Sequence, residues 1–307
     1  MSIALLFPGQ GAQRPGMLAL VPETSAAQET LTQARHVCQR LDSHVDLDDP
    51  GRDTVATQLS LVSVGVACSR ALTVDGQLPV AFAAGHSVGA FTAAVAADVL
   101  TLPDALATVY LRANAMRAAC ADRRWGMAAI NGVTLSAAHS LASGVSTPDQ
   151  PLWVANVNSA TQIVVAGTLA ALDRAESDAR RRGARSFERL DVEVASHGPI
   201  QTSTEAALRE QLASVTTRPP TLSYITNSGG RAARTAQAVV DDLAASVSRT
   251  VQWYDGVRLM YELGVTCAVE VVPGHTLSRL VASAVPAVST MAVDEQSLPA
   301  VIAQARR

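Results

Sequence analysis

The sequence predicts an α/β protein with a large domain around a central, mostly parallel sheet and a small inserted α+β domain. Short, continuously apolar runs alternate with stretches of helix-forming residues, as expected of buried strands and the helices that connect them. A different order (strand, helix, strand, strand, helix, strand) occupies the middle of the chain and is typical of a ferredoxin-like domain. The chain has 307 residues, which is long enough for both parts.

The first elements follow from apolar runs and from the residues that end them. Residues 3–7 form a short apolar run that stops at a Pro-Gly pair, which predicts a buried strand followed by a polar loop. Residues 80–84 form a second such run, and strong helix formers follow at 90–99. Pro103 stands at the start of another helical stretch, in the first turn that proline prefers.

The middle of the chain holds four predicted strands and two predicted helices. The strands lie at residues 127–130, 153–157, 162–166 and 187–194. The helices lie at residues 136–141 and 169–182, and Gly183 closes the second. Two more strands are expected at residues 222–226 and 267–272. We therefore expect a large domain formed by residues 1–124 and 196–307, and a small domain at residues 125–195.

Composition and charge exclude several classes of protein. The net charge is −3 and the basic residues are scattered, so no nucleic-acid partner is expected. No apolar run reaches the ~18 residues needed to span a bilayer. The four cysteines lie far apart without a metal-ligand pattern, so neither a disulfide framework nor a metal site is expected. A reduced, cytoplasmic setting without a membrane partner fits these patterns.

Residues 85–89 read GHSVG, a GxSxG motif between a predicted strand and a predicted helix. A sharp strand-to-helix turn exposes the serine hydroxyl, and the flanking glycines keep the space around it clear. The N-terminus of the following helix favours negative charge that develops there. Ser87 is therefore the candidate nucleophile of an α/β-hydrolase-like large domain. The alternative is an inert serine in a glycine-rich turn.

A serine nucleophile needs a base, and the chain has six histidines. His197 follows the last predicted strand of the small domain, where the chain re-enters the large domain. A loop at such a junction places its side chain in the cleft between domains. His86 adjoins the nucleophile, but the chain direction points its ring away from the hydroxyl.

Arg112 lies in the middle of a predicted helix and has two interpretations. The simpler one is an arginine that faces solvent. The functional one is a guanidinium fork that grips a substrate carboxylate through two parallel, charged hydrogen bonds.

Motifs along nearly the whole chain resemble the malonyl-CoA:acyl-carrier-protein transacylase family. They stand in the family's order at residues 7–13, 85–89, 111–112, 156–159, 164–167, 196–197, 251–253 and 271–274. One motif of this length arises by chance, but so many in one order are specific. The resemblance implies an enzyme that carries malonyl groups on a serine by ping-pong chemistry.

The resemblance also implies a role for each candidate residue. Ser87 is the nucleophile and His197 is its general base. The backbone N–H groups of Gln10 and Val88 form the oxyanion hole, and Arg112 binds the malonyl carboxylate. Acetyl groups lack that carboxylate, so they would leave a partly buried cation unpaired.

Two further residues support the site by the same resemblance. Gln252 stands where the family supports its histidine through a backbone carbonyl, and Asn158 is a weaker candidate for support around the site. Neither a metal nor a bound cofactor is implied. The expected partners are malonyl-CoA, as a thioester substrate, and an acyl carrier protein that brings a phosphopantetheine-type arm.

Two branches of the family compete for this chain. One supplies malonyl groups to fatty-acid or polyketide synthesis, and the other is the epsilon subunit of malonate decarboxylase (MdcH type), which loads that enzyme's own carrier subunit. Ala90 and Phe91 stand where the first branch usually shows Glu-Tyr, and residues 198–201 and 273–276 also depart from its pattern. These departures favour the malonate decarboxylase branch and its carrier.

Proteins of other classes share parts of the pattern. GxSxG also marks serine esterases and thioesterases, but those enzymes usually carry a different oxyanion loop and have no use for Arg112. A non-catalytic scaffold that binds the carrier is the second rival. It predicts that Ser87→Ala retains pathway flux.

Overall fold

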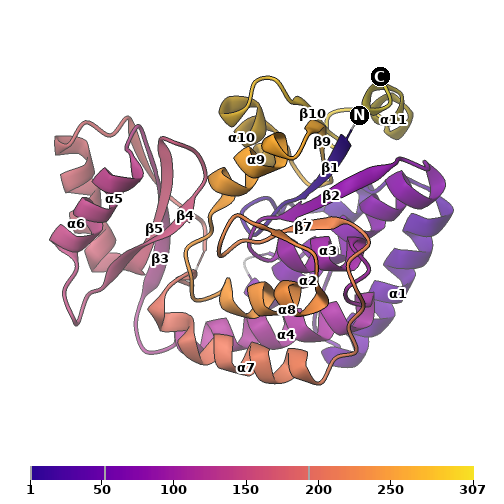
Figure 1. Ribbon diagram of the computed structural model, residues 1–307. Coiled ribbons are helices and arrows are strands. Elements are labelled where there is room, and N and C mark those ends of the chain that lie inside the picture. Colours follow the sequence, from indigo (N-terminus) through magenta and orange to yellow (C-terminus); the bar gives the residue numbers. More distant parts are fainter. Residues whose placement is uncertain (1, 52, 193) are drawn as a thin grey trace.

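The computed structural model describes residues 2–51, 53–192 and 194–307. Its larger sheet has the strand order β10-β9-β1-β2-β7-β8 (Figure 1). These strands are β1 (Ser2–Phe7), β2 (Val80–Gly85), β7 (Ser223–Ile225), β8 (Ala232–Ala233), β9 (Val265–Glu270) and β10 (Ser289–Ala292). Neighbouring strands run parallel except β7 and β8. The mostly parallel sheet that the sequence predicts is therefore confirmed.

Helices cover both faces of this sheet. The core on one face contains buried side chains of α1 (Ser25–Leu41), α2 (Thr54–Arg70), α3 (Gly89–Ala96), α4 (Leu102–Ala119), α7 (Thr202–Ala213), α8 (Ala236–Ala245) and α11 (Leu298–Ala305). The other face packs against α9 (Trp253–Glu262) and α10 (Thr276–Ala284). Short helical turns lie at Met17–Leu20, Ala71–Asp75 and Pro199–Gln201.

The two-sided cover explains the unbroken apolar run of β1. Successive side chains of a strand point to opposite faces, so both sets of residues need an apolar neighbour here. Leu5 and Phe7 lie in the core beneath α2 and α3, whereas Ala4 and Leu6 lie in the core beneath α9 and α10. All four side chains are fully buried.

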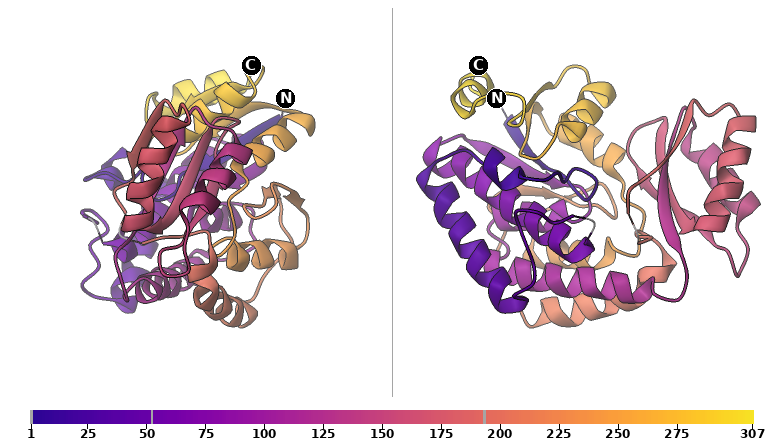
Figure 2. Two further views of the ribbon diagram at one scale, coloured as in Figure 1. Left: turned by 90° about the vertical axis from the view of Figure 1, so that its left-hand side faces the viewer. Right: turned by 180° about the vertical axis from the view of Figure 1, so that it is seen from behind.

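The smaller sheet is antiparallel and has the order β4-β5-β3-β6. Its elements are β3 (Trp125–Asn131), α5 (Leu135–Val145), β4 (Leu152–Val157), β5 (Gln162–Thr168), α6 (Leu169–Arg181) and β6 (Ser186–Arg189). Helices α5 and α6 cover its outer face, as Figures 1 and 2 show. Along β5, Ile163 and Val165 face these helices, while Val164 and Ala166 join the core of the large sheet.

One predicted strand differs from the structure. The strand expected at 187–194 ends at Arg189, because Val192 N–H turns back and donates to the carbonyl of Leu190; residue 193 lies outside the described residues.

A stretch over Thr54–Asp75 is helical and apolar enough in composition to cross a membrane. Because 94% of its apolar window is buried inside the molecule, it has the character of a core helix.

Candidate active site

Ser87 lies in the tight turn between β2 and α3. Its φ is 54°, in the left-handed region that residues with a side chain rarely adopt. The glycines on either side make the turn possible: a Cβ on Gly85 would lie 2.0 Å from the carbonyl oxygen of Gly89, and one on Gly89 would lie 2.2 Å from that of Phe7. The backbone N–H of Ser87 donates to Oδ1 of Asn227 at 2.9 Å.

His197 contacts the serine hydroxyl. Its Nε2 lies 2.9 Å from Ser87 Oγ, and its Nδ1 lies 2.6 Å from the carbonyl oxygen of Ser246. Since a carbonyl only accepts, Nδ1 carries the proton and Nε2 is free to accept the serine proton. Burial, and next the charge of Arg112, lower the pKa of His197 to about 3. The imidazole is therefore neutral at pH 7 and can act as a base.

Arg112 points inward from α4 and is 1% exposed, so the solvent-facing interpretation is wrong. One guanidinium nitrogen donates to Ser87 Oγ at 3.2 Å, and another donates to Oε1 of Gln58 at 2.5 Å. Burial lowers the pKa of Arg112 to about 10, which leaves it charged at pH 7. Within the described part of the chain no carboxylate pairs with this cation, and its Nε has no partner.

Gln10 and Val88 follow two adjacent strands of the sheet. Phe7 at the end of β1 pairs with Gly85 at the end of β2, so the loops that follow both strands lie at the same edge. Among residues 2–51, 53–192 and 194–307, no acceptor is bound to the backbone N–H of either Gln10 or Val88. Two free N–H groups beside a nucleophile are what an oxyanion hole requires.

Gln252 does not support His197, which corrects the expectation from the sequence. The carbonyl of Ser246 holds that imidazole, because the chain after α8 passes directly behind the ring. The carbonyl of Gln252 instead accepts from Gly256 N–H in the first turn of α9. The backbone N–H of Gln252 donates to the carbonyl of Asn227 at 2.7 Å, which places Gln252 beneath the Ser87 turn.

Asn158 contacts His86, the residue that precedes the nucleophile in the chain. Its Oδ1 accepts from Nε2 of His86 at 3.0 Å, and its amide donates to Gln162. The ring of His86 also packs against Trp253, with centroids 5.5 Å apart. His86 therefore faces away from the hydroxyl, as the sequence led us to expect. Burial lowers the pKa of this imidazole.

Sequence reasoning missed three polar residues that surround the site. Gln58 holds Arg112, Asn227 holds the Ser87 turn and Ser246 holds His197. Asn227 directly follows the predicted strand at 222–226, and that position at the carboxyl end of a parallel strand was an available signal. Gln58 and Ser246 lie in helical surroundings, and their sequence neighbours carry no comparable signal.

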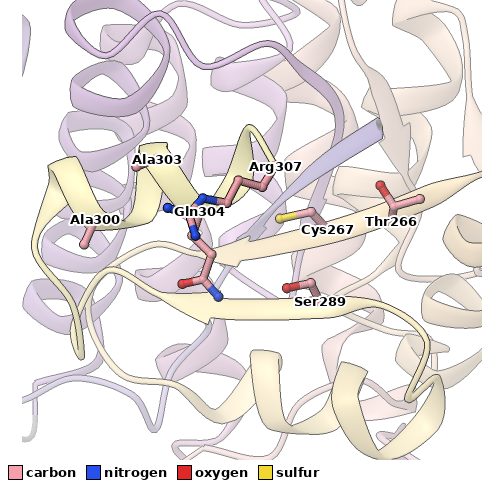
Figure 3. Close-up of a pocket in the computed structure, with 7 residues that line it drawn as sticks. All are labelled: Thr266, Cys267, Ser289, Ala300, Ala303, Gln304 and Arg307. Atoms are coloured by element: carbon pink, nitrogen blue, oxygen red, sulfur yellow. The ribbon is translucent and has the colours of Figure 1, made fainter.

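Two hollows differ in their relation to the site. One of about 470 Å³ reaches His197 and is bordered by the small sheet, with Trp153, Pro199 and Arg249 among its lining residues. Figure 3 shows another, lined by Thr266, Cys267, Ser289, Ala300, Ala303, Gln304 and Arg307. Thr266 and Cys267 stand near the start of β9. This second hollow therefore lies at the amino ends of the strands, whereas Ser87 lies at their carboxyl ends.

The α/β fold, with a serine in a strand-to-helix turn and a neutral histidine beside it, is typical of enzymes that carry an acyl group on a serine and pass it to water or to another acceptor. The chain belongs to the acyl transferase family, whose domain model, "Acyl transferase domain", matches residues 4–304. It is 31% identical to the malonyl CoA-acyl carrier protein transacylase of Salmonella typhimurium over 95% of this chain and 96% of that protein.

Solved structures support the same family. The acyl-carrier-protein S-malonyltransferase of Burkholderia pseudomallei has a TM-score of 0.89 and 29% identity, and the match covers 99% of this chain and all of that one. A malonyl-transacylase solved in complex with a type II PKS acyl-carrier protein has a TM-score of 0.91 and 27% identity, with 99% of each chain covered. The family resemblance that the sequence motifs indicate is thereby confirmed.

Proposed function

We propose that this protein transfers malonyl from malonyl-CoA to the thiol of an acyl carrier protein, through a malonyl ester on Ser87. The relatives that carry this activity in their names cover nearly the whole chain. The proposal is also supported by His197 Nε2 and an Arg112 nitrogen, which both lie within hydrogen-bond distance of Ser87 Oγ. The observation that carries the proposal is a buried Arg112 that has no carboxylate partner among the described residues and whose guanidinium donates to Ser87 Oγ at 3.2 Å.

In the first half-reaction, His197 Nε2 takes the Ser87 proton while Oγ attacks the thioester carbonyl. The tetrahedral oxyanion accepts from the N–H groups of Gln10 and Val88, and loss of one such donor typically costs about 10²–10³ in rate. The carbon–sulfur bond breaks, His197 returns the proton to the CoA thiolate, and the malonyl ester remains. The carrier's thiol then attacks the ester through the reverse steps.

Arg112 gives the reaction its preference for a carboxylated acyl group. A buried cation without a carboxylate is costly, and the malonyl carboxylate supplies the missing charge through paired hydrogen bonds. Neutralising Arg112 also removes a charge that lowers the pKa of His197, so a bound malonyl group makes the base stronger. Acetyl provides neither effect.

The proposal is tested by mass spectrometry of the intact protein after mixing with malonyl-CoA or acetyl-CoA. We expect a malonyl adduct on the wild-type protein, much less acetyl adduct, and no adduct on Ser87→Ala. A malonyl adduct that persists on Ser87→Ala contradicts the proposal. Circular dichroism of the variant shows that the fold is retained.

The carrier itself is a separate question. The relatives support an acyl carrier protein of biosynthetic type, whereas the sequence departures favour the malonate decarboxylase carrier subunit. Ala90 and Phe91 are fully buried in the core, so they form no part of a carrier-binding surface, and their difference from the fatty-acid pattern does not bear on docking. We therefore propose the biosynthetic carrier first.

A direct competition decides between the two carriers. The protein is incubated with malonyl-CoA and equal amounts of a phosphopantetheine carrier and a carrier with the dephospho-CoA-derived arm. Malonyl on the first carrier supports the biosynthetic assignment. Preferential loading of the second instead assigns the chain to malonate decarboxylase.

A further inference from the structure

Asn227 connects two backbone groups of the Ser87 turn. Its Nδ2 donates to the carbonyl of Gly85 at 2.7 Å, and its Oδ1 accepts from the N–H of Ser87 at 2.9 Å. One amide thus binds the turn on both sides of His86. A primary amide is suited to this task because it offers a donor and an acceptor side by side. The Asn227 residue is 3% exposed, so water does not replace these bonds readily.

Asp242 in α8 holds the backbone of Asn227 in turn. One carboxylate oxygen accepts from Asn227 N–H at 2.8 Å and from the Tyr224 hydroxyl at 3.0 Å. The other accepts from the N–H and the hydroxyl of Ser228, at 2.8 and 2.7 Å. Asp242 is 3% exposed, and the four donors to its carboxylate offset part of the cost of burial, which still raises the pKa of this group.

The same turn of α8 holds the base. Ser246 N–H donates to the carbonyl of Asp242 at 2.8 Å, so the two residues are one helical turn apart. The carbonyl of Ser246 accepts from His197 Nδ1, and the carbonyl of Val247 accepts from His197 N–H at 2.7 Å. The nucleophile and the base, which are 110 positions apart in the chain, therefore share one support.

The nucleophile Ser87 and the base His197 both have an unusual backbone conformation. The φ angles of Ser87 and His197 are 54° and 58°, in the left-handed region. Such conformations persist only where the surrounding structure holds them. We propose that Asn227 and Asp242 are positioning residues that keep Ser87 Oγ within reach of His197 Nε2. This inference rests on the proposed role of Ser87 as the nucleophile.

A merely structural role makes a different prediction from a positioning role. If these residues only stabilise the fold, their loss lowers the number of folded molecules and leaves the rate of each folded molecule unchanged. If they position the dyad, folded molecules react more slowly while malonyl-CoA still binds, because Arg112 is untouched. The rate constant must therefore be measured for each competent active site.

The experiment is single-turnover acylation by malonyl-CoA, quenched at short times and read by mass spectrometry. The end-point amount of malonyl-Ser87 counts the competent sites. For Asn227→Ala we expect the rate constant to fall about 10²-fold, the size of effect that a misplaced reacting group produces, with the half-saturating malonyl-CoA concentration unchanged. Asp242→Asn keeps the side-chain shape and is expected to slow acylation less.

Thr235→Ala is the matched control. Thr235 caps the N-terminus of α8 through Ala238 N–H and does not touch the Ser87 turn. We expect it to lower the melting temperature and to leave the rate constant per competent site at the wild-type value.

The proposal is overturned if Asn227→Ala acylates at the wild-type rate per site, or if Thr235→Ala slows acylation as much. Should Asn227→Ala fail to fold, a wild-type rate for Asp242→Asn overturns it instead, and a slower rate supports it. Failure of the proposed function looks different, since wild-type protein then gains no malonyl on Ser87.

Discussion

Ser87 Oγ accepts a hydrogen bond from Arg112 and lies 2.9 Å from the unprotonated nitrogen of His197. In the free protein, the guanidinium therefore occupies the space beside the oxygen that will attack. A substrate carboxylate offers Arg112 a stronger, charged acceptor than a hydroxyl does. When malonyl binds, we expect Arg112 to exchange Ser87 Oγ for the malonyl carboxylate. Oγ then keeps its hydrogen bond to His197 alone.

The first prediction concerns acyl choice. Arg112→Ala removes the partner of the malonyl carboxylate, and losing one side of a buried charge pair costs roughly 2–5 kcal/mol. We expect kcat/KM for malonyl-CoA to fall by orders of magnitude while that for acetyl-CoA holds or rises. An equal loss for both thioesters would contradict the carboxylate-binding role. Arg112→Lys should not rescue the activity, because an ammonium lacks the planar fork.

The second prediction concerns pH. Burial and the Arg112 charge lower the pKa of His197 from 6.5 to about 3, so the base stays neutral as the pH falls through 6.5. We expect kcat/KM of the wild-type protein to show no inflection at pH 6.5. In Arg112→Ala, we expect the inflection that reports His197 to lie at a higher pH than in the wild-type protein. Rates measured at constant ionic strength test this. A wild-type inflection near 6.5 would contradict it.

The same shift has a consequence for stability. Between the two pKa values the unfolded chain binds a proton at His197 and the folded protein does not, so stability falls as the pH drops below 6.5 towards 3. His197→Gln removes this contribution. Thermal melts of both proteins across this range should therefore differ in slope, with the variant losing less stability on acidification.

Residue identities in the site were predictable where a motif defines them. Ser87, His197, Arg112, Gln10 and Val88 come from motifs, and the structure brings them to one edge of the sheet. Gln252 was misplaced because sequence alone does not tell which backbone carbonyl faces an imidazole. That choice is made by the path of the chain after α8, which brings the carbonyl of Ser246 to His197 Nδ1.

The strand β2 and helix α3 act as a unit whose geometry depends on two close approaches. Gly85 and Gly89 each lie where a Cβ would overlap a backbone oxygen of another residue. We predict that Gly85→Ala prevents the turn, lowers the free energy of unfolding by about 1–3 kcal/mol, as overpacking typically does, and abolishes acylation of Ser87. Denaturant unfolding and mass spectrometry measure the two effects.

Gly144→Ala is the control for that variant. Gly144 is an exposed residue of α5, and the nearest atom to an added Cβ would be 3.9 Å away. Alanine suits a helix better than glycine by roughly 0.5–1 kcal/mol, so this variant should be slightly more stable and fully active. Comparable inactivation of both variants would contradict the account of the turn.

Elements with two-sided burial or clear end signals were predicted well. β1 and β2 are unbroken apolar runs because helices cover both faces, and α4 has its proline in the first turn. The edge strand β10 and the two-residue β8 went unrecognised, since neither forms an apolar run of the length expected of a strand. Tertiary pairing defines these strands, and sequence periodicity does not report it.

On the scale of the whole molecule, the site lies where the two sheets meet. Val251 exchanges backbone hydrogen bonds with Ala155 and Val157 of β4, and Trp153 Nε1 donates to the carbonyl of Ser196 beside the base. The ferredoxin-like order of the small sheet was predictable from its six elements. Its docking was not, because the contacts join residues about 40 to 100 positions apart. The domain limits at 124/125 and 195/196 stay a prediction.

The most direct test of the central claim follows the malonyl group after it reaches the protein. Malonyl-enzyme is prepared, freed of CoA and mixed with holo acyl carrier protein, and both proteins are weighed by mass spectrometry over time. We expect malonyl to leave Ser87 and appear on the carrier thiol, with little free malonate. Release of malonate at the same rate with or without carrier would make the protein a hydrolase and contradict the proposed transfer.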